Sequence, residues 1–500
     1  MTIDYASERV KVPKKVRSIA IIGGGPAAAV TLDTLKQQNA FDEITVFERG
    51  SHLGGVWNIS DSFNEKLPIA PGSDMRTLDP PLENIPRDLE IGQTVEVRRS
   101  RQHRFDEGAG YKRLRTNVPQ QLMCFSDLKE WGIPDERKID KDYCYAEDVR
   151  DYIRRYFARH SKDHIELNTS VEEVYKDYSF SDSKFVLTLR KNTNDRDTNG
   201  GYIDTWYKKE FDALLIATGH YNVPFIPEVD GLDKVFAKYP SKLIHSKYFV
   251  PGVDTYDDEV VVVIGSRISA FDIITSLSKT AKFVYNSKKQ IPEVQQKNQG
   301  FENIQEKPLI TSYSLKTSDN GEDEITVHFS DGSTVVNPDR IIYATGYHSS
   351  YPFLEKNFPN FSLGHTLPDL YDHTIYTKDP LLAVIGIPTS AITFRVFEYQ
   401  AIYVSAFLAG KLTLPSIKEQ NRWCLERFSK YGNSRLYHAF EAEKFNWTRE
   451  LIAKSGNYHD GINGRKYPEY TQEDEDLHKE VLKKYAEEVY YFLDPTKMYF

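Results

Sequence analysis

The fold is decided by Ser18-Ile19-Ala20-Ile21-Ile22-Gly23-Gly24-Gly25-Pro26-Ala27-Ala28-Ala29-Val30, a stretch continued by Ile44-Thr45-Val46-Phe47-Glu48. A short apolar run ends in glycines, a helix-like segment follows, and a second apolar run ends in an acid. This order predicts a strand–helix–strand unit with the pattern G-x-G-x-x-A, which is typical of a dinucleotide-binding fold.

Each position of this pattern has a physical role. Gly23 allows the tight turn out of the strand, Gly25 lets the backbone approach a pyrophosphate, and the small Ala28 lets helix and strand pack closely. The helix N-terminus presents free N–H groups and a positive dipole end to the phosphates. Glu48 lies 20 residues beyond Ala28, where a carboxylate can accept a hydrogen bond from a ribose hydroxyl. Because an acid there disfavours a 2′-phosphate, we expect FAD or NAD at this site and not NADP.

Composition narrows the class of protein. The chain has 500 residues, 27% of them charged, and a net charge of −9, which argues against nucleic acid or an anionic membrane as the main partner. Its cysteines (Cys124, Cys144 and Cys424) form neither a disulfide framework nor a zinc pattern. The N-terminus lacks the apolar core of a signal peptide, and no apolar run reaches the roughly 18 residues of a membrane span. We expect a cytoplasmic protein without a bound metal.

Further segments point to the same ligand. Two glycines stand beside an aromatic residue in Leu53-Gly54-Gly55-Val56-Trp57, which suits backbone lying against a flat ligand. A dense apolar run at 211–220 ends in Ala-Thr-Gly and predicts a buried parallel strand. The residues expected to bind the first cofactor are Gly23, Gly25, Pro26, Ala27, Ala28, Glu48, Arg49, Gly55, Val56, Trp57, Thr116, Asn117, Met123, Val171, Thr218 and Gly219.

A second strand–turn–helix pattern begins at Glu259 and contains Gly265-Ser266-Arg267-Ile268-Ser269-Ala270. Arg267 stands where the close-approach glycine would be, and its guanidinium could meet a phosphate. The following strand ends in Ser287-Lys288-Lys289 instead of an acid. A hydroxyl and cations in place of the carboxylate predict a 2′-phosphate and hence NADP. We expect Gly265, Ser266, Arg267, Ser269, Ala270, Ser287 and Lys288 to bind it, with Lys288 as the main contact to the 2′-phosphate.

Two Ala-Thr-Gly strand ends, at 217–219 and 344–346, flank the second pattern, and Thr345 and Gly346 are also expected among the cofactor-binding residues. This arrangement predicts an α/β protein in which one Rossmann-like domain is inserted into another. We expect an FAD-binding domain at 17–222 and 336–415, an inserted NADP-binding domain at 223–335, and a helical extension at 416–500. Glu90 to Arg98 is expected to form a hairpin, and Lys191 to Gly201 a loop tip.

With these elements in place, the chain resembles the flavin-containing monooxygenases over roughly residues 17–415. The resemblance rests on both fingerprints and on Gly54-Gly55-x-Trp57, Leu114-x-Thr116-Asn117-x-Pro119, Met123-x-Phe125-Ser126-Asp127, Ala344-Thr345-Gly346-Tyr347 and Phe397-Glu398-x-Gln400-Ala401. The signature F-x-G-x-x-x-H-x-x-x-(Y/F) appears as Tyr239-x-Ser241-x-x-x-His245-x-x-x-Phe249, so tyrosine and serine replace its first two residues. No tryptophan follows the histidine as in Baeyer–Villiger relatives, which disfavours ketone oxidation.

The resemblance implies an enzyme in which NADPH reduces FAD and O2 then forms a C(4a)-hydroperoxyflavin, which oxygenates the sulfur or nitrogen of a small nucleophile. It implies that Asn117 acts as the catalytic residue, through a hydrogen bond near the flavin or the nicotinamide. His245 is interpreted as a residue that fixes the domain geometry.

Other classes of protein remain open at this point. A disulfide reductase would need a close cysteine pair, but Cys124 and Cys144 are 20 residues apart on separate segments. An amine N-hydroxylase, an NADPH oxidase that releases hydrogen peroxide, and a non-catalytic flavoprotein scaffold share the cofactor pattern. The aromatic C-terminal extension leaves a homodimer open.

Overall fold

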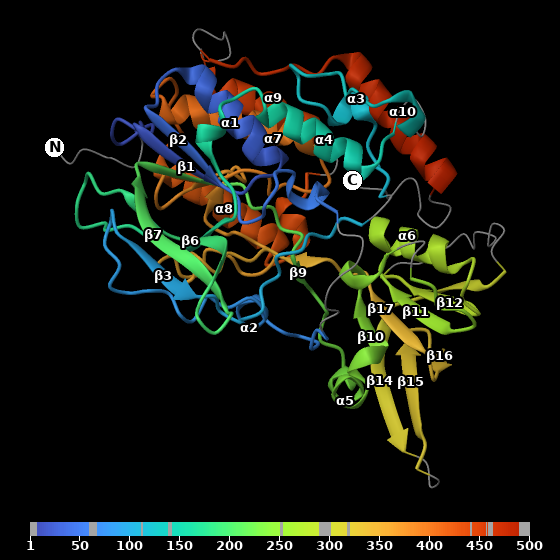
Figure 1. Ribbon diagram of the computed structural model, residues 1–500. Helices are drawn as coiled ribbons and strands as arrows, with labels where there is room; N and C mark the ends of the chain where they lie inside the picture. Colours follow the sequence, from blue (N-terminus) through green and yellow to red (C-terminus); the bar gives the residue numbers. More distant parts are fainter. Residues whose placement is uncertain are drawn as a thin grey trace.

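The computed structural model of the chain describes residues 8–59, 68–111, 114–138, 143–250, 254–289, 302–317, 321–440, 443–456, 458 and 464–489. A larger body has its helices above its strands, and a smaller body projects from it at the lower right of Figure 1. The larger body combines the two ends of the chain, whereas the smaller body is built from the middle, coloured green and yellow.

The core of the larger body is a mainly parallel sheet whose central strand leads into Gly23. This strand, β1, pairs in parallel with β2 on one side and β8 on the other. Every residue of β1 is buried, which explains why its sequence is apolar on both faces. The strand order is β19 (Leu370–Tyr371), β20 (Ile375–Tyr376), β21 (Leu382–Val384), β8 (Ala213–Ile216), β1 (Ser18–Ile22), β2 (Glu43–Phe47) and β4 (Ile165–Glu166).

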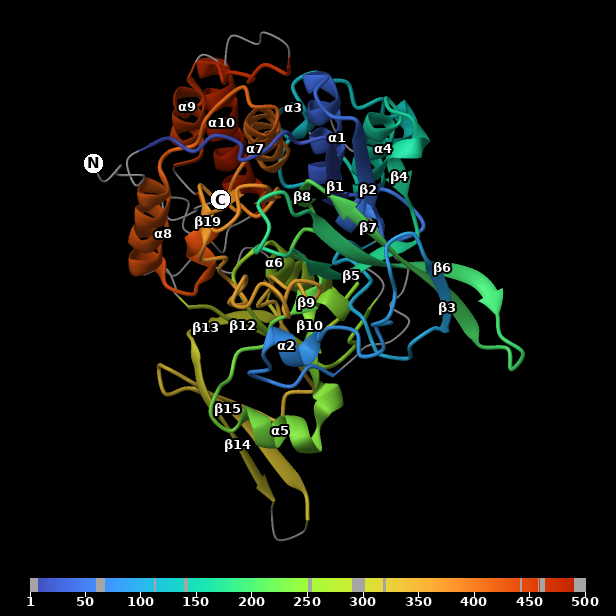
Figure 2. The ribbon, with the colours of Figure 1, turned by 90° about the vertical axis from the view of Figure 1, so that its left-hand side faces the viewer.

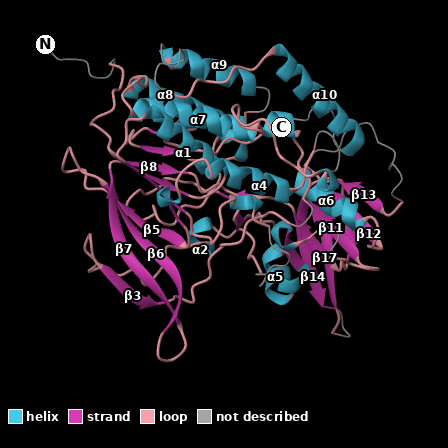
Figure 3. Cartoon of the chain, turned by 45° about the horizontal axis from the view of Figure 1, so that its top comes forward, coloured by secondary structure: helices cyan, strands magenta, loops and turns pink. Residues whose placement is uncertain are grey.

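Helices cover one side of this sheet. The fingerprint helix α1 (Pro26–Gln38) packs against α7 (Thr393–Leu408) and α4 (Ala146–Phe157), and all three lie above the strands in Figure 3. Their contact is close because α1 begins with the small residues Ala27–Ala29, all buried. In α4 the buried positions recur at helical spacing and include Val149, Ile153, Tyr156 and Phe157.

An antiparallel sheet lies beside the first, in the order β3 (Thr94–Arg98), β7 (Tyr202–Phe211), β6 (Phe185–Arg196) and β5 (Thr169–Tyr175). One expectation is wrong here and another is right only in part. β3 pairs with β7 instead of forming a hairpin from Glu90. The loop tip expected at 191–201 is confined to 197–201, because residues 191–196 extend β6. The cause is long-range: Arg99 Nε donates to Asp204 Oδ1 on β7 at 2.8 Å, and the Asp204 side chain is fully buried.

The smaller body is a five-stranded parallel sheet that carries the second fingerprint. Its order is β10 (Leu243–His245), β17 (Arg340–Tyr343), β11 (Val260–Ile264), β12 (Phe283–Ser287) and β13 (Ile304–Lys307). The remaining elements are α5 (Leu232–Lys238), α6 (Ile268–Leu277), β14 (Ile310–Thr317), β15 (Asp323–Phe329) and β16 (Thr334–Val336).

The predicted α/β class with two Rossmann-like sheets is confirmed. One boundary needs correction, because we placed the return to the first domain at residue 336. β17 pairs with β10 and β11, so the second sheet continues to Tyr343. We therefore propose that the inserted domain spans 223–343 and that residues 344–415 complete the first domain.

The chain passes between the two bodies twice, and the two connecting segments are hydrogen-bonded to each other. β9 (Val223–Pro224) pairs antiparallel with β18 (Tyr347–His348). The buried His245 accepts from Lys247 N at its Nδ1 (3.1 Å) and therefore donates from Nε2 to the Gly346 carbonyl oxygen (2.8 Å). Burial lowers the pKa of His245 to about 3, so the ring is neutral. The His245 ring therefore holds the second connecting segment, at Gly346, against the end of β10.

The C-terminal extension is helical in the part of the chain that the structure describes, as predicted. Figure 2 shows α8 (Ile417–Tyr431), α9 (Lys444–Lys454) and α10 (Gln472–Val489) on the side of α7 and β19; the rest of the predicted tail, 490–500, lies outside the described residues. None of the described helices is long and apolar enough to cross a membrane. Short helical turns occur at α2 (Met75–Leu78), α3 (Gln120–Met123), Gly55–Trp57, Asp135–Arg137, Lys162–His164, Pro240–Lys242, Ser246–Tyr248 and Arg435–His438.

A buried arginine from this extension ties the larger body together. Arg465, with a side chain only 5% exposed, contacts Asp33 Oδ2 of α1 at 2.6 Å, Asp127 Oδ1 at 2.7 Å and Glu398 Oε1 of α7 at 2.5 Å. Burial alone would lower the pKa of the guanidinium, but the surrounding carboxylates, led by Glu398, raise it. Three segments far apart in the sequence thus share one cation.

A buried histidine pair forms a second link to the extension. His373 Nδ1 and His438 Nδ1 are 2.8 Å apart, and the Leu367 N–H donates to His438 Nε2. His438 must therefore be neutral, with its proton on Nδ1, to donate to His373. Burial lowers the pKa of both rings well below the ordinary value.

Replacing Arg465 with methionine should lower the free energy of unfolding by about 3–5 kcal/mol, because the buried Asp33 and Glu398 would lose their shortest arginine contacts. Urea unfolding of the holoprotein measures this loss. Lys356→Ala is a matched control: Lys356 pairs with Glu173 but is 68% exposed, so its removal should cost less than about 1 kcal/mol. Equal effects of the two substitutions would contradict the role of Arg465.

The histidine pair should make the protein sensitive to acid. Because the folded-state pKa values are depressed, the stabilisation is complete above the unfolded-state pKa of about 6.5 and is lost as pH falls below it. Each ring contributes a slope of up to about 1.4 kcal/mol per pH unit. His438→Gln should flatten the dependence of the unfolding free energy between about pH 7.5 and 5.5. An unchanged slope would show that the pair does not titrate on unfolding.

Candidate functional site

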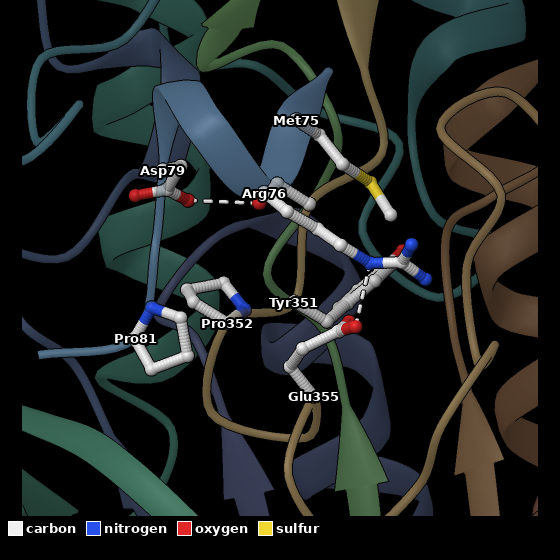
Figure 4. A pocket seen from close by; sticks show the side chains of 8 residues that line it. Met75, Arg76, Asp79, Pro81, Tyr351, Pro352 and Glu355 are labelled. Carbon is white, nitrogen blue, oxygen red and sulfur yellow. Dashed lines mark hydrogen bonds and ion pairs between the residues drawn. The ribbon is translucent and has the colours of Figure 1, made fainter.

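A cavity of about 760 Å³ opens at the carboxyl ends of β1, β2 and β8. Its size is that of a cofactor or ligand site, and its position is where open parallel sheets bind ligands. The main lining segments are 22–27, 47–52, 55–59, 104–108, 168–172 and 217–223. A separate hollow of about 10 Å³ near Met75 and Tyr351, which the Arg76–Glu355 ion pair borders, has room for little more than a water (Figure 4).

The first fingerprint forms one wall of the large cavity. Gly23 has φ +110°, and a Cβ there would lie 2.4 Å from the Ala217 carbonyl oxygen, so only glycine fits. Gly25 precedes α1 and faces Gly55: a Cβ on Gly55 would lie 2.8 Å from the Gly25 Cα. Two backbone segments therefore meet without side chains at the start of α1, where its N–H groups are free to bind an anion.

Glu48 follows β2 at the edge of the cavity. Its Oε1 accepts from Gly50 N at 2.6 Å, and burial raises the pKa of the carboxyl. Its neighbour Arg49 donates to the carbonyl oxygens of Phe105 (3.1 Å) and Asp106 (3.3 Å). The loop 104–108 is thereby held against the cavity, which gives Arg49 a structural contact as well as a place in the lining.

The structure brings together most residues predicted for the first cofactor. The cavity lining contains Gly23, Gly25, Pro26, Ala27, Glu48, Arg49, Gly55, Val56, Trp57, Val171, Thr218 and Gly219. It does not contain Ala28, Thr116, Asn117 or Met123. Ala28 is fully buried in the packing of α1, and Met123 is buried at the end of α3. Thr116 N donates to the Cys144 carbonyl oxygen at 2.9 Å, and the half-buried Asn117 lies in the turn that follows.

The second fingerprint lies at the corresponding edge of the smaller body. Gly265 ends β11 with φ +141° against the Ala344 backbone, and the exposed Arg267 is the N-cap residue of α6. Ser266, Ser269 and Ala270 lie in the same turn and first helical residues. Thr345 is not free for a ligand, because its hydroxyl donates to the Phe225 carbonyl oxygen. None of these residues lines the large cavity.

The expectation for Lys288 needs correction. Its side chain is 2% exposed, and its Nζ contacts Glu306 Oε1 of β13 at 2.5 Å; burial lowers its pKa. The Ser287 hydroxyl donates to the Pro308 carbonyl oxygen at 2.9 Å. No local sequence pattern predicts the pairing of β12 with β13. This pairing gives Ser287 and Lys288, the groups predicted for the 2′-phosphate, partners within the protein. Arg267 is the predicted phosphate contact that stays exposed.

Sequence reasoning missed several residues at the cavity. Arg154 of α4 donates from Nε to the Leu53 carbonyl oxygen (3.0 Å) and from Nη2 to Asn58 Oδ1 (3.1 Å), and so holds the loop around Gly55. Its helical position gave no signal, because arginines on an outer helix face are usually solvated. His220 and His348 also line the cavity, and neither ring nitrogen of either side chain has a hydrogen-bond partner among the described residues.

Comparison with known proteins agrees with this geometry. A profile described as pyridine nucleotide-disulphide oxidoreductase matches residues 116–386, more than half of the chain, and one described as NAD(P)-binding Rossmann-like domain matches residues 21–70. The chain belongs to the pyridine nucleotide-disulphide oxidoreductase family. Its cysteines Cys124, Cys144 and Cys424 are buried and none of them is in a disulfide.

Its relatives are monooxygenases. The chain is 26% identical to flavin-containing monooxygenase ustF2 of Aspergillus flavus over 87% of this chain and 90% of the relative. It is 28% identical to the thiol-specific monooxygenase of Saccharomyces cerevisiae, with 86% and 85% covered. The structure of S-allyl-L-cysteine S-oxygenase from Allium sativum superposes with a TM-score of 0.70 at 25% identity, with 97% of both chains covered. The predicted resemblance is confirmed: the chain is a flavoprotein monooxygenase with FAD and NADPH as cofactors.

The residues at the large cavity fit FAD. The side-chain-free approach of Gly25 to Gly55 leaves room for a pyrophosphate at the start of α1. Gly23–Ala27 would hold that pyrophosphate, and Glu48 would accept from a ribose hydroxyl. The second fingerprint, with Gly265 and Arg267, has the form that would hold NADPH.

Gly25→Ala should reduce FAD binding without unfolding the protein. The backbone of Gly25 (φ −88°) suits alanine, and a Cβ there meets nothing closer than 3.6 Å. The methyl group would instead occupy space needed by the pyrophosphate, so we expect FAD affinity to fall about tenfold or more. Reconstitution of apoprotein, followed by flavin absorbance, measures the change. Gly201→Ala, at the distant β6–β7 turn, should retain FAD, and full FAD affinity in Gly25→Ala would contradict the assignment.

Proposed function

We propose that the protein is an NADPH- and O2-dependent monooxygenase that transfers one oxygen atom to a soft nucleophile, with the sulfur of a small thiol or thioether as the preferred acceptor. The single observation that carries the proposal is the cavity at β1, β2 and β8, built around the first fingerprint, in a chain that carries a second fingerprint on its second parallel sheet. The choice of sulfur is supported by the thiol-specific and S-allyl-L-cysteine relatives.

The flavin, when bound, supplies the reaction with O2, and the protein supplies position and exclusion of water. The wall from Gly23 to Ala27 would orient the cofactor, while Trp57 and Phe397 contribute apolar surface to the lining. The imidazole of His220 is neutral near pH 7, because burial lowers its pKa to about 4. It offers both a hydrogen-bond donor and an acceptor to the cavity.

Turnover under 18O2 tests the proposal. Holoenzyme with NADPH and a thioether should incorporate one 18O atom per NADPH consumed, as measured by mass spectrometry of the sulfoxide. If the electrons appear instead as hydrogen peroxide, whatever sulfur or nitrogen acceptor is supplied, the protein is an NADPH oxidase. If a tertiary amine is oxygenated and sulfur compounds are not, the preference for sulfur is wrong. Absence of NADPH consumption would indicate a non-catalytic flavoprotein.

Asn117→Ala should keep FAD but lose most oxygenated product, about tenfold or more, if its amide forms a hydrogen bond at the reacting centre. Asn117 is half-buried at a turn, so the substitution should leave the fold intact. Product formed per NADPH, rather than NADPH consumption alone, is the measurement. Asn199→Ala, at the exposed β6–β7 turn, is the matched control. A normal product yield from Asn117→Ala would remove this residue from the site.

A further inference from the structure

Two arginines from different bodies of the molecule approach the same segment, residues 389–390, and have no carboxylate partner among the described residues. Thr389 N donates to the His438 carbonyl oxygen in the helical turn that Arg435 begins. Arg267 caps α6 in the inserted domain, and Arg435 begins a helical turn of the C-terminal extension. Desolvation of its guanidinium and then the charge of Arg267 lower the pKa of Arg435. Neither arginine forms an ion pair with a described residue, and Arg267 Nη1 lies 3.5 Å from Ser390 Oγ.

The surroundings of Arg435 are aromatic and neutral. Its guanidinium lies against the Cα of Gly346, where an added Cβ would be 2.5 Å from Nη2. Its Cζ is 5.8 Å from the centre of the Phe225 ring. After Arg267, the side chains of Tyr221 and Tyr347 are the other groups that interact electrostatically with Arg435. The arginine thus lies near the end of β17, where no described residue provides an anion to balance it.

This position coincides with the phosphate end of the second fingerprint. Gly346 closes the Ala-Thr-Gly segment after β17, which neighbours β11 in the sheet. Arg267 stands at the N-terminus of the ten-residue helix α6, whose free N–H groups favour an anion. His220 adds two buried ring nitrogens without a partner among the described residues, and its pKa is lowered by burial and by Arg435.

We propose that Arg435 and Arg267 together bind a phosphate group of NADPH, so that the C-terminal extension completes the nucleotide site of the inserted domain. This inference rests on the proposed use of NADPH but not on oxygen transfer. Paired guanidiniums suit phosphate because each offers several donors in a fixed planar geometry. A phosphate held between them would also join the inserted domain to the larger body.

Equilibrium binding of NADP+ to the oxidised holoenzyme, measured by calorimetry, tests the proposal without turnover. Arg435→Gln and Arg267→Gln should each weaken NADP+ binding about tenfold to a hundredfold, the range for one charge-assisted contact. Arg435→Lys should recover part of the affinity because it restores the charge. Arg422→Gln is the matched control, since Arg422 lies on the same extension and is 69% exposed. FAD content and melting temperature report whether each variant is folded.

Parallel titration with NAD+ distinguishes the two phosphate sources. An equal loss for NADP+ and NAD+ places the pyrophosphate between the arginines, and a loss confined to NADP+ places the 2′-phosphate there; both results support the proposal. Unchanged NADP+ affinity in folded Arg435→Gln overturns it. If the variant instead raises KM only for a thioether that carries a carboxylate, and not for a neutral thioether, the site binds an acidic substrate and the proposal is wrong.

Failure of the proposed function would look different. Wild-type protein that binds NADP+ but forms no oxygenated product would refute the oxygen transfer and leave the two-arginine site standing. Wild-type protein that does not bind NADP+ would refute both.

Discussion

The structure of the larger body depends on the charge of Arg465. Its guanidinium satisfies Asp33 on the fingerprint helix, Asp127 after the segment of Asn117, and Glu398 on α7. Ser126 N also donates to Glu398 Oε2 at 3.0 Å. Burying the carboxylates of Asp33 and Glu398 is unfavourable unless a cation and hydrogen bonds compensate them, so the packing of α1 and α7 depends on the extension.

This constraint gives the extension a part in the site. The helix α1, which presents its N-terminus to the cofactor cavity, is fixed at one side chain by Arg465, and α7 contributes Phe394 and Phe397 to the cavity lining. Asp127, which follows the segment from Thr116 to Met123, connects that segment to the same cluster. A change in the extension can therefore move the cofactor wall without touching it, which is why Arg465 is a structural residue and not a catalytic one.

The predictable parts of the fold are those encoded by residues close together in the sequence. Gly23, Gly25 and Glu48 encode a turn, a close approach and an acid within one strand–helix–strand unit, and they line one cavity as expected. Lys288 was misassigned because its partner, Glu306, belongs to a strand that no local pattern places beside it. The course of β17 and the position of Arg154 depend in the same way on pairing between distant segments. Local sequence determines which chemical groups a residue provides. Pairing between distant segments determines whether those groups already have a partner within the protein.

The two arginines of the extension illustrate this difference. Arg465 and Arg435 have the same side chain and similar sequence surroundings, but the first meets three carboxylates and the second meets another cation. Arg465 is buried and balanced by carboxylates, whereas Arg435 is exposed and has no carboxylate partner among the described residues, so its charge is open to an anion from solution. A bound phosphate would supply the anion that the described residues do not. On this argument the extension serves the larger body through Arg465 and the inserted domain through Arg435, and the two bodies are held most firmly when the nucleotide is bound.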